Sequence, residues 1–338
     1  MVNTPLLSIA IPLYNKEQYL RACLSSIFEA AHNCDWVEVL IVNDGSTDGS
    51  MQIVAQFEAD RRLRVVTQKN GGVSKARNTA LREVRGDFIW FVDADDMVAP
   101  GALKVIKADL DRWAADTELF AYPMVLKNAD LSGDERVLMT YMHPQRHRIE
   151  GHANVKRRFP SVTQAPWLVN LDIQVGMRVI ARSLFDRSGL DFPPGLIYED
   201  LATLPRLTMA ARGIRVSRKP LCWYFNRVGS IMNTPDLRQN LDIIPVAKML
   251  TQYALDFDDP RVYLEAEFLA VVHLMAATYR RVYEIDRRAP ELPVLRDTLR
   301  TLYPKWRENP LVRALTWKRR ALLEANALGL GFINRFVG

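Results

Sequence analysis

The amino-acid sequence predicts an α/β fold, in which a mostly parallel sheet carries helices on both faces and is followed by a helical C-terminal extension. Over residues 1–100, short apolar runs alternate with segments whose apolar residues recur with a helical period. This β-α-β-α order is typical of parallel sheets. Beyond residue 236 the pattern is helical nearly to the end, with prolines as interruptions.

The strands and helices of the first part each have a local signal. Short, mainly apolar runs predict strands over Leu6–Ile11, Val37–Val42 and Phe88–Val92, and a further strand is predicted over Arg64–Thr67. Helical periodicity predicts four helices that follow these strands in turn, over Glu17–Ala30, a segment through Ile53–Phe57, Val73–Val84 and Ala102–Trp113. Ser46, Thr47 and Asp48 offer N-cap oxygens to the second helix, and a glycine pair precedes the third.

The rest of the chain gives a less regular pattern. From residue 117 to residue 162, short apolar runs alternate with charged stretches and predict no clear element. Strand signals return at Gly176–Ile180 and Cys222–Phe225, and a helical segment follows Tyr198. In the last part we expect the helices to be separated by four prolines, Pro290, Pro293, Pro304 and Pro310.

Composition narrows the class of protein. Of the 338 residues, 49% are apolar and 25% are charged, which is typical of a globular chain and excludes a disordered one. The three cysteines are widely spaced and form no C-x-x-C pair, so no disulfide framework is expected. No apolar run reaches the ~20 residues of a membrane span, and the N-terminus lacks the basic segment of a secretory signal. We therefore expect a cytoplasmic location.

The net charge of +6 is concentrated at one end of the chain. Residues 300–338 contain eight Lys or Arg and two acids, so the remaining residues are neutral overall. The basic segment Lys318–Arg320 lies among apolar residues such as Trp317 and Phe336. Such a helix either makes a peripheral contact with the inner face of an anionic membrane or packs against the folded protein. Nucleic acid is not an expected partner, because no basic face carries interleaved aromatic residues.

Polar residues follow each of the four predicted strands. The clusters are Pro12–Asn15, Asn43–Gly49, Asn70–Asn78 and Asp93–Asp96. Because the carboxyl ends of parallel strands meet at one edge of a sheet, we expect the clusters to converge there.

The converging side chains describe a site for a nucleoside diphosphate bridged by a metal ion. Tyr14 can stack on a base, and the Asp44 carboxylate can accept hydrogen bonds from a base or a ribose. Lys75 and Arg77 can neutralise phosphate. The Asp-x-Asp pair after the fourth strand can supply oxygen ligands to a divalent cation. Each feature alone also fits an ordinary structural role, namely packing for the tyrosine, turn chemistry for Asp44 and a solvated loop for the acidic pair.

The same segments resemble the family-2 glycosyltransferases of GT-A fold. The likeness over residues 5–100 is carried by SIAIPLYNKEQYLRACLSSI, VEVLIVNDGSTDGS, NGGVSKARNTAL and GDFIWFVDADD. A second block over about residues 165–232 resembles the acceptor half of these enzymes. The segments that carry this likeness run from GLIYEDLATLPRLTMAA through CWYFNRVGSIM. The resemblance implies a nucleotide-sugar-binding half at 1–100, an acceptor-binding half at 101–235 and a helical extension at 236–338.

The resemblance also implies roles for individual residues. The donor nucleotide sugar would be bound at its base by Pro12, Tyr14 and Asp44, and elsewhere by Asn70, Lys75, Arg77, Asp93, Ala94, Arg227 and Ser230. Asp93 and Asp95 would hold Mn²⁺ or Mg²⁺, with Asp95 as the main ligand. Asp200, in the Tyr198-Glu199-Asp200 motif, would be the catalytic base. From the residues alone, Glu199 and Asp200 also fit as first-turn acids of a helix.

The implied reaction is inverting, metal-dependent transfer of one sugar from a nucleoside-diphosphate sugar, by family habit a UDP-sugar, to a hydroxyl of a glycan or lipid-linked acceptor. The expected setting is the synthesis of bacterial cell-surface polysaccharide or lipooligosaccharide. Single addition is expected because the Gln-x-x-Arg-Trp motif of processive synthases is missing. Two other functions stay open: a nucleotidyltransferase, and a catalytically silent glycosyltransferase-like partner subunit. The basic segments at 146–148 and 156–158 are either solvated or contacts for an anionic acceptor.

Overall fold

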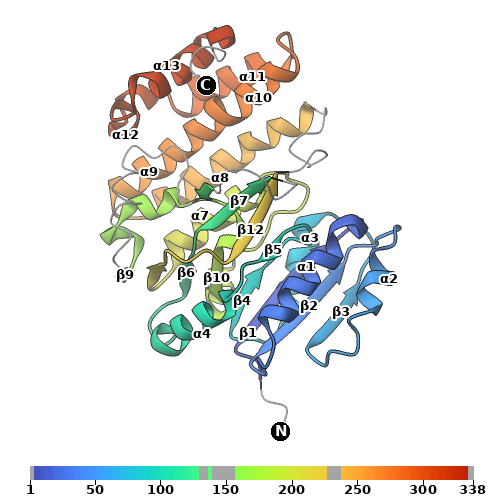
Figure 1. Ribbon diagram of the computed structural model, residues 1–338. Helices are drawn as coiled ribbons and strands as arrows, with labels where there is room; N and C mark the ends of the chain where they lie inside the picture. The colour runs from blue at the N-terminus through green and yellow to red at the C-terminus, as the bar shows by residue number, and fades with distance from the viewer. Residues whose placement is uncertain (1–3, 129–135, 139–156, 227–236, 334–338) are drawn as a thin grey trace.

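The computed structural model describes residues 4–128, 136–138, 157–226 and 237–333. The chain up to residue 226 forms layers in which helices cover both faces of a sheet, and a group of C-terminal helices is stacked beyond these layers (Figure 1). The two parts share one apolar core, to which the C-terminal helices and helices of the layered part both contribute.

The large sheet confirms the predicted class. Within the described residues it has eight strands in the order β3-β2-β1-β4-β10-β6-β11-β9. The strands are β1 (Leu7–Leu13), β2 (Val37–Asn43), β3 (Leu63–Thr67), β4 (Phe88–Phe91), β6 (Leu119–Ala121), β9 (Arg157–Phe159), β10 (Arg178–Ala181) and β11 (Ile214–Val216). Only β9 and β10 run antiparallel to their neighbours in this sheet, so it is mostly parallel.

A smaller sheet begins just after β4. Its order is β5-β12-β7-β8, and its strands are β5 (Met97–Val98), β7 (Met124–Asn128), β8 (Arg136–Leu138) and β12 (Cys222–Asn226). Of the strands after β4, the sequence pattern predicts only β10 and β12. The others are two to five residues long, which is too short for a recognisable alternation of apolar residues. Their pairing with distant segments defines them.

Each face of the large sheet is covered by its own helices, as predicted. Ile9 and Ile11 of β1 contribute to one apolar core and Ala10, between them, contributes to the other, because successive strand residues face opposite sides. The first core also contains residues from α1 (Glu17–Ala30), α2 (Ser50–Ala55) and α4 (Ala102–Trp113). The second contains residues from α3 (Val73–Glu83), α6 (Arg182–Ser188) and α7 (Glu199–Ala210).

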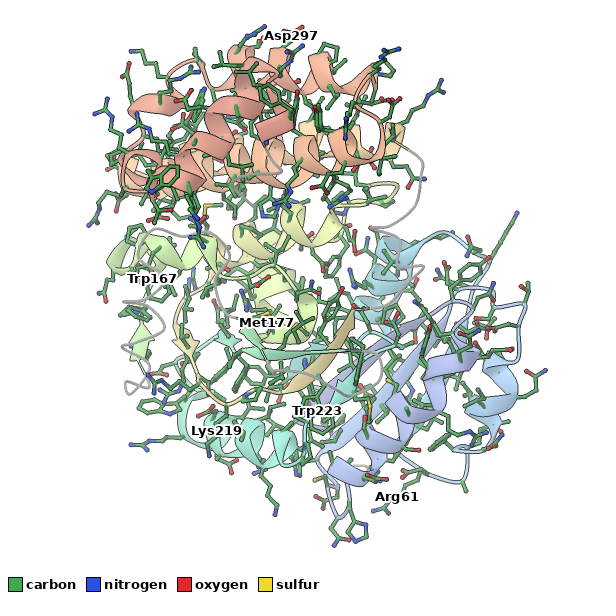
Figure 2. All side chains as sticks on the ribbon, turned by 45° about the horizontal axis from the view of Figure 1, so that its top comes forward. Arg61, Trp167, Met177, Lys219, Trp223 and Asp297 are labelled. Carbon is green, nitrogen blue, oxygen red and sulfur yellow. The ribbon has the colours of Figure 1, made fainter. Side chains whose placement is uncertain are left out.

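From residue 237 to residue 333 the described chain is mainly helical, as the sequence predicts. Its helices are α8 (Ile243–Leu255), α9 (Pro260–Val271), a π-helical segment (Val272–Tyr279), α10 (Arg280–Ile285), α11 (Glu291–Leu302), α12 (Pro310–Arg313) and α13 (Trp317–Leu328). Pro290 lies at the N-cap of α11, and Pro310 lies in the first turn of α12. Figure 2 places Asp297, on α11, at the opposite end of the molecule from Arg61, which precedes β3.

One of the C-terminal helices is 26 residues long. The stretch Pro260–Ile285 is continuous, and among the described residues it alone is long and apolar enough to cross a membrane. However, 78% of its most apolar window is buried inside the protein, which is the property of a core helix.

The basic C-terminal segment packs against the protein over part of its surface. Leu322 and Leu323 of α13 are buried in the core, as in the second of the two predicted alternatives. Trp317, at the start of α13, is 73% exposed, and Leu328 and Phe332 are exposed at its other end.

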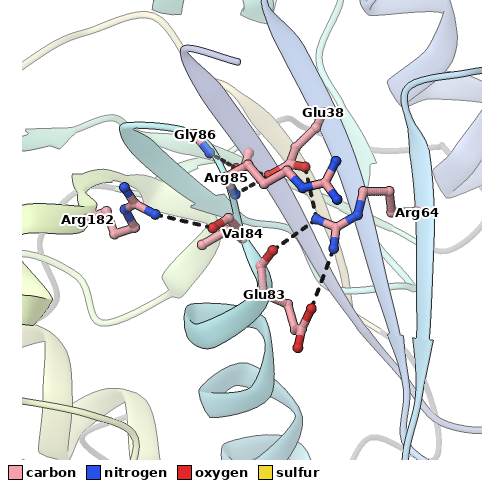
Figure 3. Close-up of polar contacts among 8 residues, drawn as sticks. Glu38, Arg64, Glu83, Val84, Arg85, Gly86 and Arg182 are labelled. Carbon is pink, nitrogen blue, oxygen red and sulfur yellow. Dashed lines mark hydrogen bonds and ion pairs between the residues drawn. The ribbon is translucent and has the colours of Figure 1, made fainter. Parts of the chain in front are cut away.

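A polar network at the amino edge of the sheet joins the starts of three strands to the end of α3 (Figure 3). Glu38 of β2 accepts hydrogen bonds from the Ser8 hydroxyl of β1 and the Arg85 backbone, and it pairs with Arg64 of β3. Arg64 also donates to a backbone carbonyl at the end of α3, at 2.9 Å. Position 86 must be glycine, because a Cβ on Gly86 would lie 2.7 Å from the Ser8 backbone nitrogen. The network therefore fixes the carboxyl end of α3 relative to the sheet.

Candidate active site

Arg77, on α3, lies at the centre of the candidate site and is buried. Its guanidinium donates to Asp93, which follows β4, at 3.0 Å. It also donates to the two acids that begin α7, to Glu199 at 2.7 Å and to Asp200 at 2.6 Å. The Phe192 ring packs on the guanidinium, with 5.3 Å between the guanidinium carbon and the ring centre. One buried cation therefore holds together carboxylates from two distant segments, both of which the sequence singles out.

Three carboxylates around one guanidinium give this cluster a net negative charge. Burial raises the pKa of Asp200 well above its ordinary value, although Arg77 opposes the rise. Burial also raises the pKa of Glu199, again against the effect of Arg77. Burial by itself lowers the pKa of Arg77, but the three carboxylates outweigh it and hold this pKa above its ordinary value. The Asp200 side chain is 19% exposed, so a carboxylate with a raised proton affinity is still accessible from solvent.

The acidic pair after β4 lies at the rim of the cluster. Asp93 pairs with Arg77, and Asp95 accepts a hydrogen bond at 2.5 Å from the ammonium of Lys16, which follows β1. Both carboxylates are partly exposed. Within the described part of the chain, no three His, Cys, Asp or Glu side chains form a metal site by themselves. Two partly exposed carboxylates, each of which already contacts a cationic side chain, do fit an ion whose other ligands are water and phosphate oxygens.

Asp44 is buried at the end of β2 and organises the glycine turn before α3. Its carboxylate accepts hydrogen bonds from the Gln68 side chain at 2.6 Å and from the backbone of Gly71 and Gly72. Gly72 has a φ of 87°, a left-handed conformation that favours glycine. These contacts match the turn chemistry that the sequence left open for Asp44, and binding of a base by this residue stays a prediction.

The other predicted donor-site residues lie around the same edge where the structure describes them. Tyr14 is 46% exposed directly after β1. Asn70 and Lys75 are exposed on either side of the glycine pair, Pro12 is half-buried in β1, and Ala94 is buried between the two acids. Arg227, Ser230 and the basic segment 146–148 lie outside the described residues, so their roles stay predictions.

Two residues of the site have no role assigned by sequence reasoning. Lys16 pairs with Asp95, and Glu199 contacts Arg77. Each is close in sequence to a residue that was assigned, because Lys16 follows the first polar cluster and Glu199 precedes Asp200. The excess of acids over cations in the predicted site is the signal that points to Lys16.

Comparison with known sequences shows the family. The family model described as Glycosyl transferase family 2 matches residues 8–166. The glycosyltransferase GlyG of Streptococcus pneumoniae is 30% identical over 246 residues, which cover 71% of this chain and 78% of GlyG. This chain belongs to glycosyltransferase family 2. It spans less than half of other curated relatives, whose alignments cover 16%, 27% and 43% of their length.

Solved structures resemble this family-2 chain over nearly its whole length. Residues 1–349 of TarS from S. aureus, crystallised with UDP, give a TM-score of 0.67 at 22% identity, covering 98% of this chain and 89% of that one. The mannosyltransferase PcManGT from Pyrobaculum calidifontis, in complex with GDP-Man and Mn²⁺, gives a TM-score of 0.55 at 19% identity, covering 96% and 86%. Together with the family membership, these likenesses agree with the expected GT-A fold.

Proposed function

We propose that this family-2 protein transfers one sugar, with inversion, from a UDP-sugar to a hydroxyl of a glycan or lipid-linked acceptor in bacterial surface-polysaccharide synthesis. The observation that carries the proposal is the cluster in which Arg77 joins Asp93, from the loops at the carboxyl edge, to Asp200. Family membership supports the reaction class. TarS, a poly(ribitol-phosphate) beta-N-acetylglucosaminyltransferase, has been crystallised with UDP-GlcNAc, which supports the choice of donor.

Asp200 is the proposed general base. The acceptor oxygen attacks the anomeric carbon on the side opposite the diphosphate, and the bond from that carbon to the diphosphate oxygen breaks. The hydroxyl proton passes to the Asp200 carboxylate, a step that contributes about 10²–10⁴-fold to the rate in enzymes. The raised pKa of Asp200 favours this transfer, and the contact with Arg77 at 2.6 Å orients the carboxylate.

Mn²⁺ or Mg²⁺ is the proposed cofactor, held by Asp95 together with Asp93. The contact between the Lys16 ammonium and Asp95 supports this assignment, because a positive charge already lies beside this carboxylate and the lysine side chain is partly exposed. A bound divalent ion would stabilise the negative charge of the departing diphosphate. PcManGT, of the same overall fold, was solved with Mn²⁺, which supports this assignment.

The donor site is tested by thermal unfolding with UDP, GDP, dTDP and CMP, each with and without Mn²⁺. We expect UDP with Mn²⁺ to raise the melting temperature most, because a ligand that binds only the folded state stabilises it by about 2.7 kcal/mol at a hundredfold excess over Kd. No shift with any nucleotide would contradict the proposal and favour a silent partner subunit. Release of pyrophosphate in place of UDP during turnover would favour a nucleotidyltransferase.

Asp95→Asn should lower the Mn²⁺-dependent affinity for UDP by about tenfold or more, because it removes the charge of the main proposed ligand. The matched control is Asp87→Asn, which changes an exposed carboxylate just before the other end of β4. Isothermal titration of UDP at fixed Mn²⁺ measures the difference. Equal affinities for wild type and Asp95→Asn would exclude Asp95 as a metal ligand.

A cytoplasmic location with peripheral membrane contact is also proposed. Around α13, exposed Trp317 and Leu328 lie near the exposed cations Lys318 and Arg320, a combination that suits an anionic bilayer surface. We expect the protein to sediment with phosphatidylglycerol vesicles but not with phosphatidylcholine vesicles, and Trp317→Gln to reduce the bound fraction. Leu255→Gln, at a similarly exposed apolar position on α8, is the control. If both variants bind like the wild type, the contact does not involve this surface.

A further inference from the structure

Tyr198 directly precedes the two acids that contact Arg77, and it is the N-cap residue of α7. Its buried hydroxyl lies 3.1 Å from the Thr278 hydroxyl and donates to the Asn240 side-chain oxygen at 3.3 Å. Arg281 donates to the Tyr198 oxygen and to the Asn240 oxygen, at 3.2 Å each. All three partners belong to the helical part of the chain beyond residue 236.

The contact between the start of α7 and the helical part extends beyond this hydroxyl. The Ile197 backbone N–H donates to the Asp242 carboxylate at 3.1 Å. Thr278 belongs to the π-helical segment, and such segments are uncommon and recur at functional sites. The start of α7 is therefore held from two sides, by Arg77 from the sheet and by these polar groups from the C-terminal helices.

We propose that Tyr198 is a positioning residue for the catalytic base, and that the C-terminal helices act on the reaction through it. The Tyr198 carbonyl accepts the first backbone hydrogen bond of α7, from Ala202 at 2.9 Å. A displacement of Tyr198 therefore moves the first turn of α7, and Asp200 with it. Misplacement of a reacting group by about 1 Å costs an enzyme up to ~10²-fold in rate. This inference rests on the proposed function, because it concerns the geometry of the same base.

The test is Tyr198→Phe, which removes the hydroxyl and keeps the ring. The assay is release of UDP from UDP-GlcNAc with water as the acceptor. We expect kcat to fall by about tenfold, from lost hydrogen bonds and a less ordered first turn. The donor KM and the thermal shift caused by UDP should stay unchanged, because Tyr198 does not contact the donor loops in the proposal.

Tyr303→Phe is the matched control within the helical part. The buried Tyr303 hydroxyl lies 3.3 Å from the Thr251 hydroxyl and donates to the Ala247 carbonyl at 3.0 Å. Tyr303→Phe therefore removes a buried, hydrogen-bonded tyrosine hydroxyl that does not contact the start of α7. This variant should lower the melting temperature about as much as Tyr198→Phe and leave kcat unchanged.

The variant Thr278→Val tests the positioning role of Tyr198 independently. It changes a residue on the other side of the contact, far from α7 in sequence, and keeps the side-chain shape. We expect a smaller loss of kcat than in Tyr198→Phe, and we expect the double variant to lose no more than Tyr198→Phe alone, because both changes remove one shared interaction.

Two results would overturn the inference: wild-type kcat in Tyr198→Phe, or an equal loss of kcat in Tyr198→Phe and Tyr303→Phe. The second result would mean that both variants act through general destabilisation. If the proposed function itself is wrong, the wild-type protein will turn over none of the nucleotide sugars tried. That result differs from both outcomes above, in which the wild-type protein is active.

Discussion

The Asp200→Asn variant should bind UDP like the wild type and release UDP from UDP-GlcNAc about 10²–10⁴-fold more slowly, because it removes the proposed proton acceptor. The exchange should be tolerated by the fold. Burial raises the pKa of Asp200 because it opposes the charged form, so a neutral amide of the same shape carries a smaller desolvation cost at this position. The measurement is kcat beside the thermal shift caused by UDP with Mn²⁺.

The pH dependence of the wild-type rate gives an independent readout of the same residue. The rate should rise with pH as Asp200 loses its proton, with a midpoint above the ordinary aspartate pKa of about 3.9. The Asp200→Asn variant should lack this rise. Asp186→Asn, an exposed acid on α6, is the control that should keep both the rate and the profile. Full activity in Asp200→Asn would show that the base is another group.

The Arg77→Met variant should be destabilised by about 3–5 kcal/mol, the cost of removing one partner from a buried ion cluster. The side chain is nearly inaccessible, and its loss leaves Asp93, Glu199 and Asp200 without their shared cation. Equilibrium unfolding in urea measures the difference. Arg261→Met, which removes a mostly exposed arginine from its pair with Asp259, is the control and should lower the stability far less, because solvent screens an exposed charge.

The effect of pH distinguishes this electrostatic cause from a loss of packing. In the wild type the pKa of Asp200 and of Glu199 is already raised, and without Arg77 both should rise further. A carboxyl group with a raised pKa in the folded state favours folding at low pH and loses that contribution as pH rises through the raised value. The stability gap between Arg77→Met and the wild type should therefore widen as the pH rises above the ordinary pKa of these carboxyl groups. A gap that stays constant over this range would indicate that packing, not charge, dominates.

Much of the fold could be predicted because its central elements have strong local patterns. The helices predicted at Glu17–Ala30 and Ala102–Trp113 have those bounds in the structure. Three of the first four strands, β1, β2 and β4, are mainly apolar and buried along nearly their whole length, as expected for strands covered on both faces. The strands β6 and β11 were not predicted, because three residues carry no usable periodicity and only the pairing with each other and their neighbours orders them.

The candidate site was predicted in its membership more than in its contacts. The residue pattern placed Arg77, Asp93 and Asp95 at one edge of the sheet, and the family resemblance added Asp200. The structure brings Arg77, Asp93 and Asp200 into contact, and their roles stay predictions. The residue pattern assigned Arg77 to phosphate, whereas the structure pairs this side chain with three carboxylates. It also did not pair Asp95 with Lys16, and it assigned no catalytic or binding role to Glu199.

The sequence by itself therefore determined the class of fold, the order of its main elements and the residues that gather at the carboxyl edge, because periodicity and strand ends are local properties of the chain. Only the tertiary structure decided which charge faces which, and that Tyr198 contacts Thr278 across 80 residues of sequence. The reason is physical. The energy of a buried charge or hydroxyl depends on the groups that replace its water, and those groups come from segments that are brought together only when the apolar core forms.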